Sequence, residues 1–115
     1  MKIFKKLSRS VKGRVAIITG AGSGMGEATA KVFAAEGVKV VATDVNQEEV
    51  NRVSSEIIKS GGECMPFLLD VTDNTSIKNC IDATINTYKT IDFVINNAGI
   101  SLSLIHISEP TRQKP

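Results

Sequence analysis

The chain has 115 residues, which suits a single domain, and 42% of them are hydrophobic. Its formal net charge of +2 is too small to indicate a nucleic-acid-binding protein. No apolar run approaches the length of about 20 residues that crosses a membrane. The basic residues near the start surround no continuous hydrophobic stretch of the kind found in a secretory signal.

Residues 1–13 form a basic lead-in to the first predicted strand. This segment is also compatible with a weak amphipathic helix on a membrane surface. A solvated segment is favoured and no membrane partner is expected, because one or two helical turns bury little apolar area. Cys64 and Cys80 are expected to be reduced core thiols of a cytoplasmic protein. With only His106 to join them, they indicate no metal site.

Four apolar segments alternate with helical patterns along the chain. The strands are predicted over residues 14–19, 38–43, 64–69 and 91–96, and the helices over residues 27–36, 47–59 and from residue 73 to about residue 88. Asn46 is predicted to cap the second helix, and Thr72 or Asp73 the third. Pro66 suggests that the third strand lies at an edge. Because crossovers between parallel strands are right-handed, this order predicts an α/β fold, a doubly wound parallel sheet of the Rossmann type that is incomplete and has strand order 3-2-1-4.

The most informative stretch is a glycine-rich turn, residues 20–26, between the first strand and the first helix. Strand, turn and helix in this order present unpaired N–H groups and the positive end of a helix dipole to a phosphate. Gly20 allows the sharp turn, Gly24 allows a pyrophosphate to approach the backbone, and Gly26 allows the helix to pack on the strand. The alternative is a flexible glycine loop without a ligand. The flanking elements and an acid at Asp44 favour the phosphate site.

Asp44 follows the second predicted strand, which in this architecture ends beside an adenosine ribose. A carboxylate there accepts hydrogen bonds from the ribose hydroxyls and repels the 2′-phosphate of NADP. Val45 comes next, so no basic residue adjoins the acid. The sequence therefore favours NAD over NADP. The alternative is that Asp44 only caps or shapes a turn.

Polar residues also follow the third and fourth predicted strands, at Asp70-Val71 and at Asn96-Asn97-Ala98-Gly99. Ligands of open parallel sheets bind at the carboxyl ends of the strands, where the strand order reverses. The first and fourth strands flank that point, so Gly20 and Asn97 are expected to face each other across a crevice. Alone, the Asn-Asn-Ala-Gly segment is an ordinary turn. With the glycine-rich turn in register, it becomes a second wall of a cofactor site.

Together these segments resemble the signatures of the short-chain dehydrogenase/reductase family, in order and in spacing. Residues 19–26 (TGAGSGMG) match its Thr-Gly-x-x-x-Gly-x-Gly fingerprint, and Asp44, Asp70-Val71 and residues 96–99 match the next three signatures. The resemblance covers roughly residues 11–101. It implies NAD(P)-dependent hydride transfer between an alcohol and a carbonyl, with a small-molecule substrate and a homo-oligomeric parent protein.

The resemblance also implies which residues bind the cofactor. Asp70 would meet the adenine amino group, Val71 the adenine ring, and Asn97 the nicotinamide ribose. The full set of expected cofactor-binding residues is Gly20, Ser23, Gly24, Met25, Gly26, Asp44, Asp70, Val71, Asn97, Ala98 and Gly99.

The catalytic residues of the family have no counterpart in this chain. In the family a Ser and a Tyr-x-x-x-Lys motif follow the Asn-Asn-Ala-Gly turn, and the Tyr acts as general acid/base. Tyr88, the single tyrosine, precedes that turn, and Asp92 stands where the Lys would be. No catalytic residue is assigned, and this chain alone is expected to be inactive. A non-catalytic nucleotide sensor and an inert fragment stay open as alternatives.

The last residues do not resemble the family. Residues 102–112 follow, in order, one reading frame of a transposase-library sequencing adapter, and Gln113 fits the next codon. The sequence therefore predicts three parts: the lead-in at 1–13, a partial NAD(P)-binding domain at 14–101, and a non-native tail at 102–115. His106 lies in the tail and is given no role.

Overall fold

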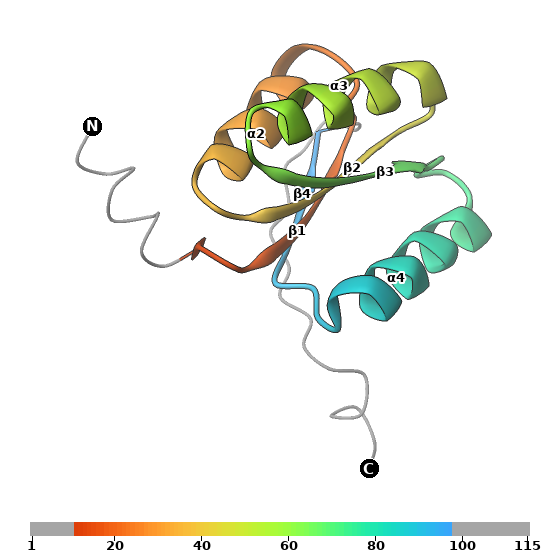
Figure 1. The fold of residues 1–115 in the computed structure, drawn as a ribbon. Coiled ribbons are helices and arrows are strands. Elements are labelled where there is room, and N and C mark those ends of the chain that lie inside the picture. Colours follow the sequence, from red (N-terminus) through yellow and green to blue (C-terminus); the bar gives the residue numbers. More distant parts are fainter. Residues whose placement is uncertain (1–10, 98–115) are drawn as a thin grey trace.

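The computed structural model describes residues 11–97, which form a parallel sheet covered by helices (Figure 1). In chain order the elements are β1 (Val15–Thr19), α2 (Gly24–Ala35), β2 (Lys39–Asp44), α3 (Gln47–Lys59), β3 (Glu63–Leu68), α4 (Asn74–Tyr88) and β4 (Phe93–Asn96). The sheet has the order β3-β2-β1-β4 and all its pairs are parallel. The predicted fold class and strand order are confirmed, and β3, which carries Pro66, is an end strand.

Helices α2 and α3 lie on one face of the sheet and α4 lies on the other (Figure 1). Side chains of β1 and β2 alternate between the two faces. Ala16 and Ile18 join the core under α2 and α3, whereas Ile17 and Val41 join the core under α4. Since both faces are covered, each of these strands is apolar along most of its length.

The two cysteines belong to these opposite cores. Cys64 lies in the core under α2 and α3, and Cys80 lies in the core under α4. Both are free and buried. Burial raises the pKa of both thiols, that of Cys80 to about 11. They therefore serve as core side chains, as predicted.

Side-chain caps begin two of the helices. The Asn46 side chain accepts a hydrogen bond from the Glu49 N–H at the start of α3, as predicted. Asp73 accepts from the Thr75 N–H and is the cap of α4, which decides between the two predicted candidates. At its other end α4 stops at Lys89, whose φ of 74° lies in the left-handed region. The predicted end of this helix at about residue 88 is confirmed, whereas its left-handed cap falls on a lysine and not on a glycine.

Helix α2 begins at Gly24, three residues before the predicted start at Glu27. The N–H of Glu27 already donates to the carbonyl of Ser23, so the first helical turn lies within the glycine-rich turn. This turn packs closely on the strand end: a Cβ at Gly26 would lie 1.9 Å from the carbonyl oxygen of Gly20. The helix start therefore sits directly against the end of β1.

Charged side chains join α2 to α3. Arg52 pairs with Glu27, Glu49 and Glu56, and Lys31 pairs with Glu27 and Glu56. Glu27 is the most enclosed of these groups, with 21% of its side chain exposed. Hydrogen bonds from Arg52 and then Lys31 lower the pKa of Glu27 to about 2.

A buried carboxylate aligns β4 with β1 at the opposite end of the sheet from the glycine-rich turn. Asp92 is 5% exposed and accepts hydrogen bonds from the N–H of Val15 at 2.9 Å and from Arg14 Nη1 at 3.4 Å. The Asp92 N–H in turn donates to the Val15 carbonyl. Asp92 therefore fixes the start of the β1–β4 pairing.

We expect Gly26→Ala to destabilise the chain by about 3 kcal/mol, because the new methyl group overlaps backbone that cannot move freely. Gly61→Ala is the matched control: Gly61 has a φ of 95° but nothing within 4 Å of an added Cβ. Its cost is therefore conformational, about 1 kcal/mol. Urea unfolding of both variants measures the difference, and equal losses would contradict the close approach of α2 to Gly20.

We expect Glu27→Gln to reduce the acid sensitivity of the fold. The pKa of Glu27 is about 2 in the folded chain against an ordinary 4.5, so its stabilisation is present above pH 4.5 and is lost as the pH falls toward 2. The free energy of unfolding should therefore fall more steeply from about pH 5 to about pH 3 in the unmutated chain than in the variant. Asp82→Asn, which removes the more exposed Lys78–Asp82 pair on α4, is the control. Equal slopes for Glu27→Gln and the unmutated chain would show that the Arg52 and Lys31 contacts are not formed in solution.

Candidate functional site

A hollow of about 450 Å³ opens at the carboxyl ends of the strands. Segments that follow all four strands contribute to it. It is lined by Thr19, Gly20, Ser23, Met25, Gly26, Asp44, Val45, Leu69, Asp70, Val71, Thr72 and Asn97. This edge includes the point between β1 and β4 where the strand order reverses, which is where ligands of this architecture bind.

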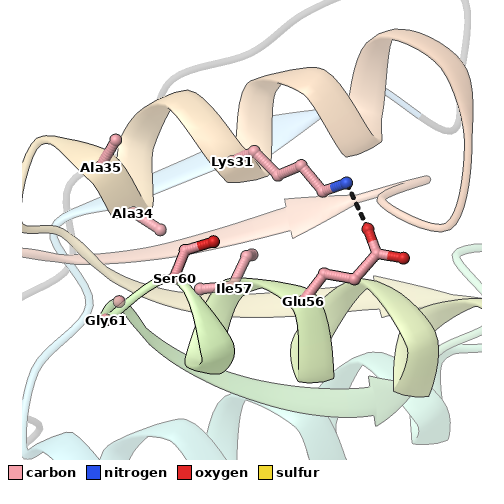
Figure 2. A pocket seen from close by; sticks show the side chains of 8 residues that line it. Lys31, Ala34, Ala35, Glu56, Ile57, Ser60 and Gly61 are labelled. Carbon is pink, nitrogen blue, oxygen red and sulfur yellow. Dashed lines mark hydrogen bonds and ion pairs between the residues drawn. The ribbon is translucent and has the colours of Figure 1, made fainter.

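A second hollow, of about 360 Å³, lies between the C-terminal halves of α2 and α3 (Figure 2). It is lined mostly by small residues, such as Ala34, Ala35 and Gly61. Its charged residues, Lys31 and Glu56, form an ion pair with each other. None of the predicted site residues lines it, so the hollow at the strand ends is the candidate site.

Most of the predicted cofactor-binding residues meet at the strand ends. Those that line the hollow are Gly20, Ser23, Met25, Gly26, Asp44, Asp70, Val71 and Asn97. Gly24 is not one of the lining residues; its φ of 59° lies in the left-handed region that favours glycine, and an added Cβ there would meet nothing within 4 Å. Ala98 and Gly99 lie outside the described residues. The cofactor contacts of the whole set stay a prediction.

The Asp44 carboxylate is held against the glycine-rich turn. Its Oδ2 accepts a hydrogen bond from the Gly22 N–H at 2.9 Å, and its Oδ1 accepts from the Asn46 N–H at 3.1 Å. A Cβ at Gly22 would lie 2.9 Å from Asp44 Oδ2 and 2.9 Å from Glu49 Cβ. The absence of a side chain at Gly22 therefore lets the acid and the turn meet, a role that the spacing of the glycines did not predict.

Asp70 forms a tight turn at the end of the segment that follows β3. Its Oδ1 accepts hydrogen bonds from the Thr72 N–H at 2.9 Å and from Thr72 Oγ1 at 2.6 Å. Both bonds lower the pKa of Asp70, and the bond from the Thr72 hydroxyl contributes most. The Asp70 N–H donates to Ser76 Oγ. The carboxylate is therefore oriented by Thr72, in the loop before α4, while the backbone of Asp70 is tied to α4 through Ser76.

Asn97 carries a buried donor that is not used. Thr19 Oγ1 donates to Asn96 Oδ1 at 2.7 Å and accepts from the Asn97 N–H at 2.9 Å, so the end of β4 is tied to the end of β1. Within residues 11–97, Asn97 Nδ2 is buried and has no hydrogen-bond partner. A buried amide without a partner costs about 1–3 kcal/mol, so a ligand with an oxygen acceptor fits here. The hydroxyl-rich ribose of a dinucleotide is such a ligand.

Four lining residues were not among the predicted cofactor-binding residues: Thr19, Val45, Leu69 and Thr72. Val45 and Met25 are 68% and 71% exposed, large apolar side chains at the rim of the hollow. Both suit the flat face of a base. The position of Val45 directly after Asp44 could have indicated that it lies in the site. Leu69 and Thr72 line the site because of the course of the loop after β3, which the sequence pattern does not give.

Two other kinds of site have no support in the part of the chain that the structure describes. Residues 11–97 contain no group of three or more His, Cys, Asp or Glu side chains that could hold a metal ion. In the same range, no helix has both the length and the apolar character needed to span a membrane.

Comparison with known proteins agrees with this geometry. The family model described as short chain dehydrogenase matches residues 14–114. The match extends into residues 102–114, which the sequence assigns to a non-native tail, and the domain boundary at 101 stays a prediction. The chain is 40% identical over 91 residues to the 3-oxoacyl-(acyl-carrier-protein) reductase FabG of Thermotoga maritima, covering 79% of this chain and 37% of the relative. It is 41% identical over 90 residues to the uncharacterized oxidoreductase YxbG of Bacillus subtilis, covering 78% of this chain and 33% of the relative.

Solved structures give the same result. A hydroxysteroid dehydrogenase from Escherichia coli superposes with a TM-score of 0.73 at 35% identity, covering 74% of this chain and 35% of that one. A short chain dehydrogenase/reductase from Burkholderia phymatum, solved in complex with NAD, superposes with a TM-score of 0.71 at 31% identity, covering 72% and 30%. The chain thus spans about a third of the length of the relatives it matches. The family match, the identities and the sheet order together place this chain in the short-chain dehydrogenase/reductase family.

Proposed function

We propose that this chain is the NAD-binding part of an oxidoreductase that transfers a hydride between an alcohol and a carbonyl. The observation that carries the proposal is the hollow at the strand ends, which joins the start of α2, the Asp44 carboxylate and the unpartnered Asn97 amide. These three features match the phosphates, the adenosine ribose and the second ribose of a dinucleotide. When bound, the nicotinamide ring supplies the hydride chemistry.

Each wall of the hollow has a distinct task in binding. The N–H groups of the glycine-rich turn and the dipole of α2 attract the pyrophosphate. Asp44 accepts from ribose hydroxyls, and Asp70 accepts from the adenine amino group while Val71 and Val45 contact the ring. Asn97 Nδ2 donates to the second ribose and by doing so gains the partner that it lacks.

Asp44 also sets the choice between NAD and NADP. Its carboxylate occupies the side of the glycine-rich turn where a 2′-phosphate would approach, and it already engages the Gly22 and Asn46 N–H groups. A phosphate there would meet a negative charge and lose access to those two donors. NAD is therefore the favoured cofactor. The Burkholderia phymatum relative was solved in complex with NAD.

The reaction itself requires groups that are not assigned here. General acid–base catalysis contributes about 10²–10⁴-fold in rate, and in this family it rests on a Ser and a Tyr-x-x-x-Lys motif that residues 1–115 do not contain. We propose that the chain alone binds the cofactor without catalysing hydride transfer. The parent enzyme acts on a small-molecule alcohol or carbonyl.

Titration calorimetry with the 115-residue chain tests the cofactor assignment. We expect NAD to bind about tenfold more tightly than NADP, a difference of about 1.4 kcal/mol. Asp44→Ser should narrow the gap by strengthening NADP binding, because it frees the Gly22 and Asn46 N–H groups. Asp70→Ser is the control and should weaken both cofactors to the same degree. Equal affinities of the unmutated chain for NAD and NADP would contradict the role of Asp44.

The enzymatic assignment is tested by the source transcript. We expect its reading frame, followed beyond residue 101, to encode a Ser and a Tyr-x-x-x-Lys motif at the spacing of the family. The protein expressed from that frame should oxidise or reduce a panel of alcohols and carbonyls, followed by NADH absorbance. An intact frame without the motif would instead favour a nucleotide sensor.

A further inference from the structure

Arg52 connects α3 to the glycine-rich turn and to the start of α2. Its Nη2 donates to the carbonyl oxygen of Gly22 at 3.2 Å and to Glu27 Oε1 at 3.0 Å, and its Nη1 donates to Glu27 Oε2 at 3.2 Å. On its own helix it binds Glu49 through Nε and Glu56 through Nη1. One guanidinium thus spans two helices and the turn between β1 and α2.

The Gly22 peptide is held from both sides. Its N–H donates to Asp44 Oδ2 from the end of β2, and its carbonyl accepts from Arg52 on α3. The absence of a side chain at Gly22 allows this approach, since a Cβ there would overlap Asp44 and Glu49. Arg52 and Asp44 together therefore set the position of the turn whose N–H groups face the proposed pyrophosphate.

Glu27 places a negative charge beside the proposed pyrophosphate. Its carboxylate lies in the first turn of α2, where a bare negative charge would repel a phosphate. A glutamate is charged at neutral pH, and hydrogen bonds from Arg52 and then Lys31 lower the pKa of Glu27 further, to about 2. Arg52 contacts both of its oxygens, and Lys31 contacts Oε2. Without Arg52, Glu27 and Glu56 would keep their ion pairs with Lys31, and Glu49 would lose the ion pair that it forms with Arg52.

We propose that Arg52 is a positioning residue of the cofactor site, which fixes the Gly22 peptide and neutralises Glu27 so that the start of α2 accepts the pyrophosphate. Arg52 does not line the hollow and acts through these two partners. The inference rests on the proposed function, because it concerns the affinity of the same site for NAD.

The first test measures the affinity of the 115-residue chain for NAD by calorimetry. We expect Arg52→Met to weaken binding about tenfold. Arg52→Lys, which keeps the charge and loses the planar fork, should weaken it less. Lys78→Met, which removes an ion pair confined to α4, is the matched control and should leave the affinity unchanged. Adding Glu27→Gln to Arg52→Met should recover about half of the lost binding free energy, a rescue that a purely structural role would not give.

The second test needs no cofactor. Hydrogen exchange of the Gly22 amide, followed by nuclear magnetic resonance, should be faster in Arg52→Met than in the unmutated chain and in Lys78→Met. If the unmutated chain folds but does not bind NAD, the proposed function fails, and the exchange rates still decide whether Arg52 positions the turn. Unchanged exchange and unchanged NAD affinity in Arg52→Met would overturn the proposal. If Arg52→Met does not fold, Arg52→Lys, judged by the same two measurements, decides the question.

Discussion

The contact between Gly26 and the carbonyl of Gly20 is the constraint on which the rest of the site depends. The first turn of α2 lies so close to the end of β1 that a Cβ at position 26 would come within 1.9 Å of that oxygen. This close approach places the start of α2, with its unpaired N–H groups and the positive end of its dipole, at the carboxyl ends of the strands. A longer separation would leave a helix on the sheet but would remove the proposed phosphate site.

Three hydrogen bonds tie the loops after the strands to their neighbours and hold the walls of the hollow in place. The Ala21 N–H donates to the Thr43 carbonyl, the Leu69 N–H donates to the Asp44 carbonyl, and the Asn97 N–H donates to Thr19 Oγ1. Each bond links the first residues beyond one strand to the end of the adjacent strand. The parallel register therefore extends into the site, and the polar residues after all four strands arrive at one edge.

The two acids nearest the proposed phosphate site each have partners of their own. Asp44 and Glu27 are both acids close to the expected phosphates, yet each is engaged: Asp44 by two backbone N–H groups, and Glu27 by Arg52 and Lys31. In the proposed function, Asp44 faces the adenosine ribose, where its charge would favour NAD over NADP. Glu27 faces α3, where its charge is neutralised. Two carboxylates in one short region thus have different consequences because their partners differ.

The sequence by itself determined the order of the elements, the parallel sheet and the edge where the site lies, because apolar periodicity, caps and glycine spacing record local burial and local hydrogen bonding. It also placed Gly20, Asp44 and Asp70 at that edge. Only the tertiary structure decided the role of Gly22, the start of α2 at Gly24 and the reach of Arg52 to Glu27. Those features depend on how closely α2, α3 and β2 approach one another, a distance that no pattern within a single segment encodes.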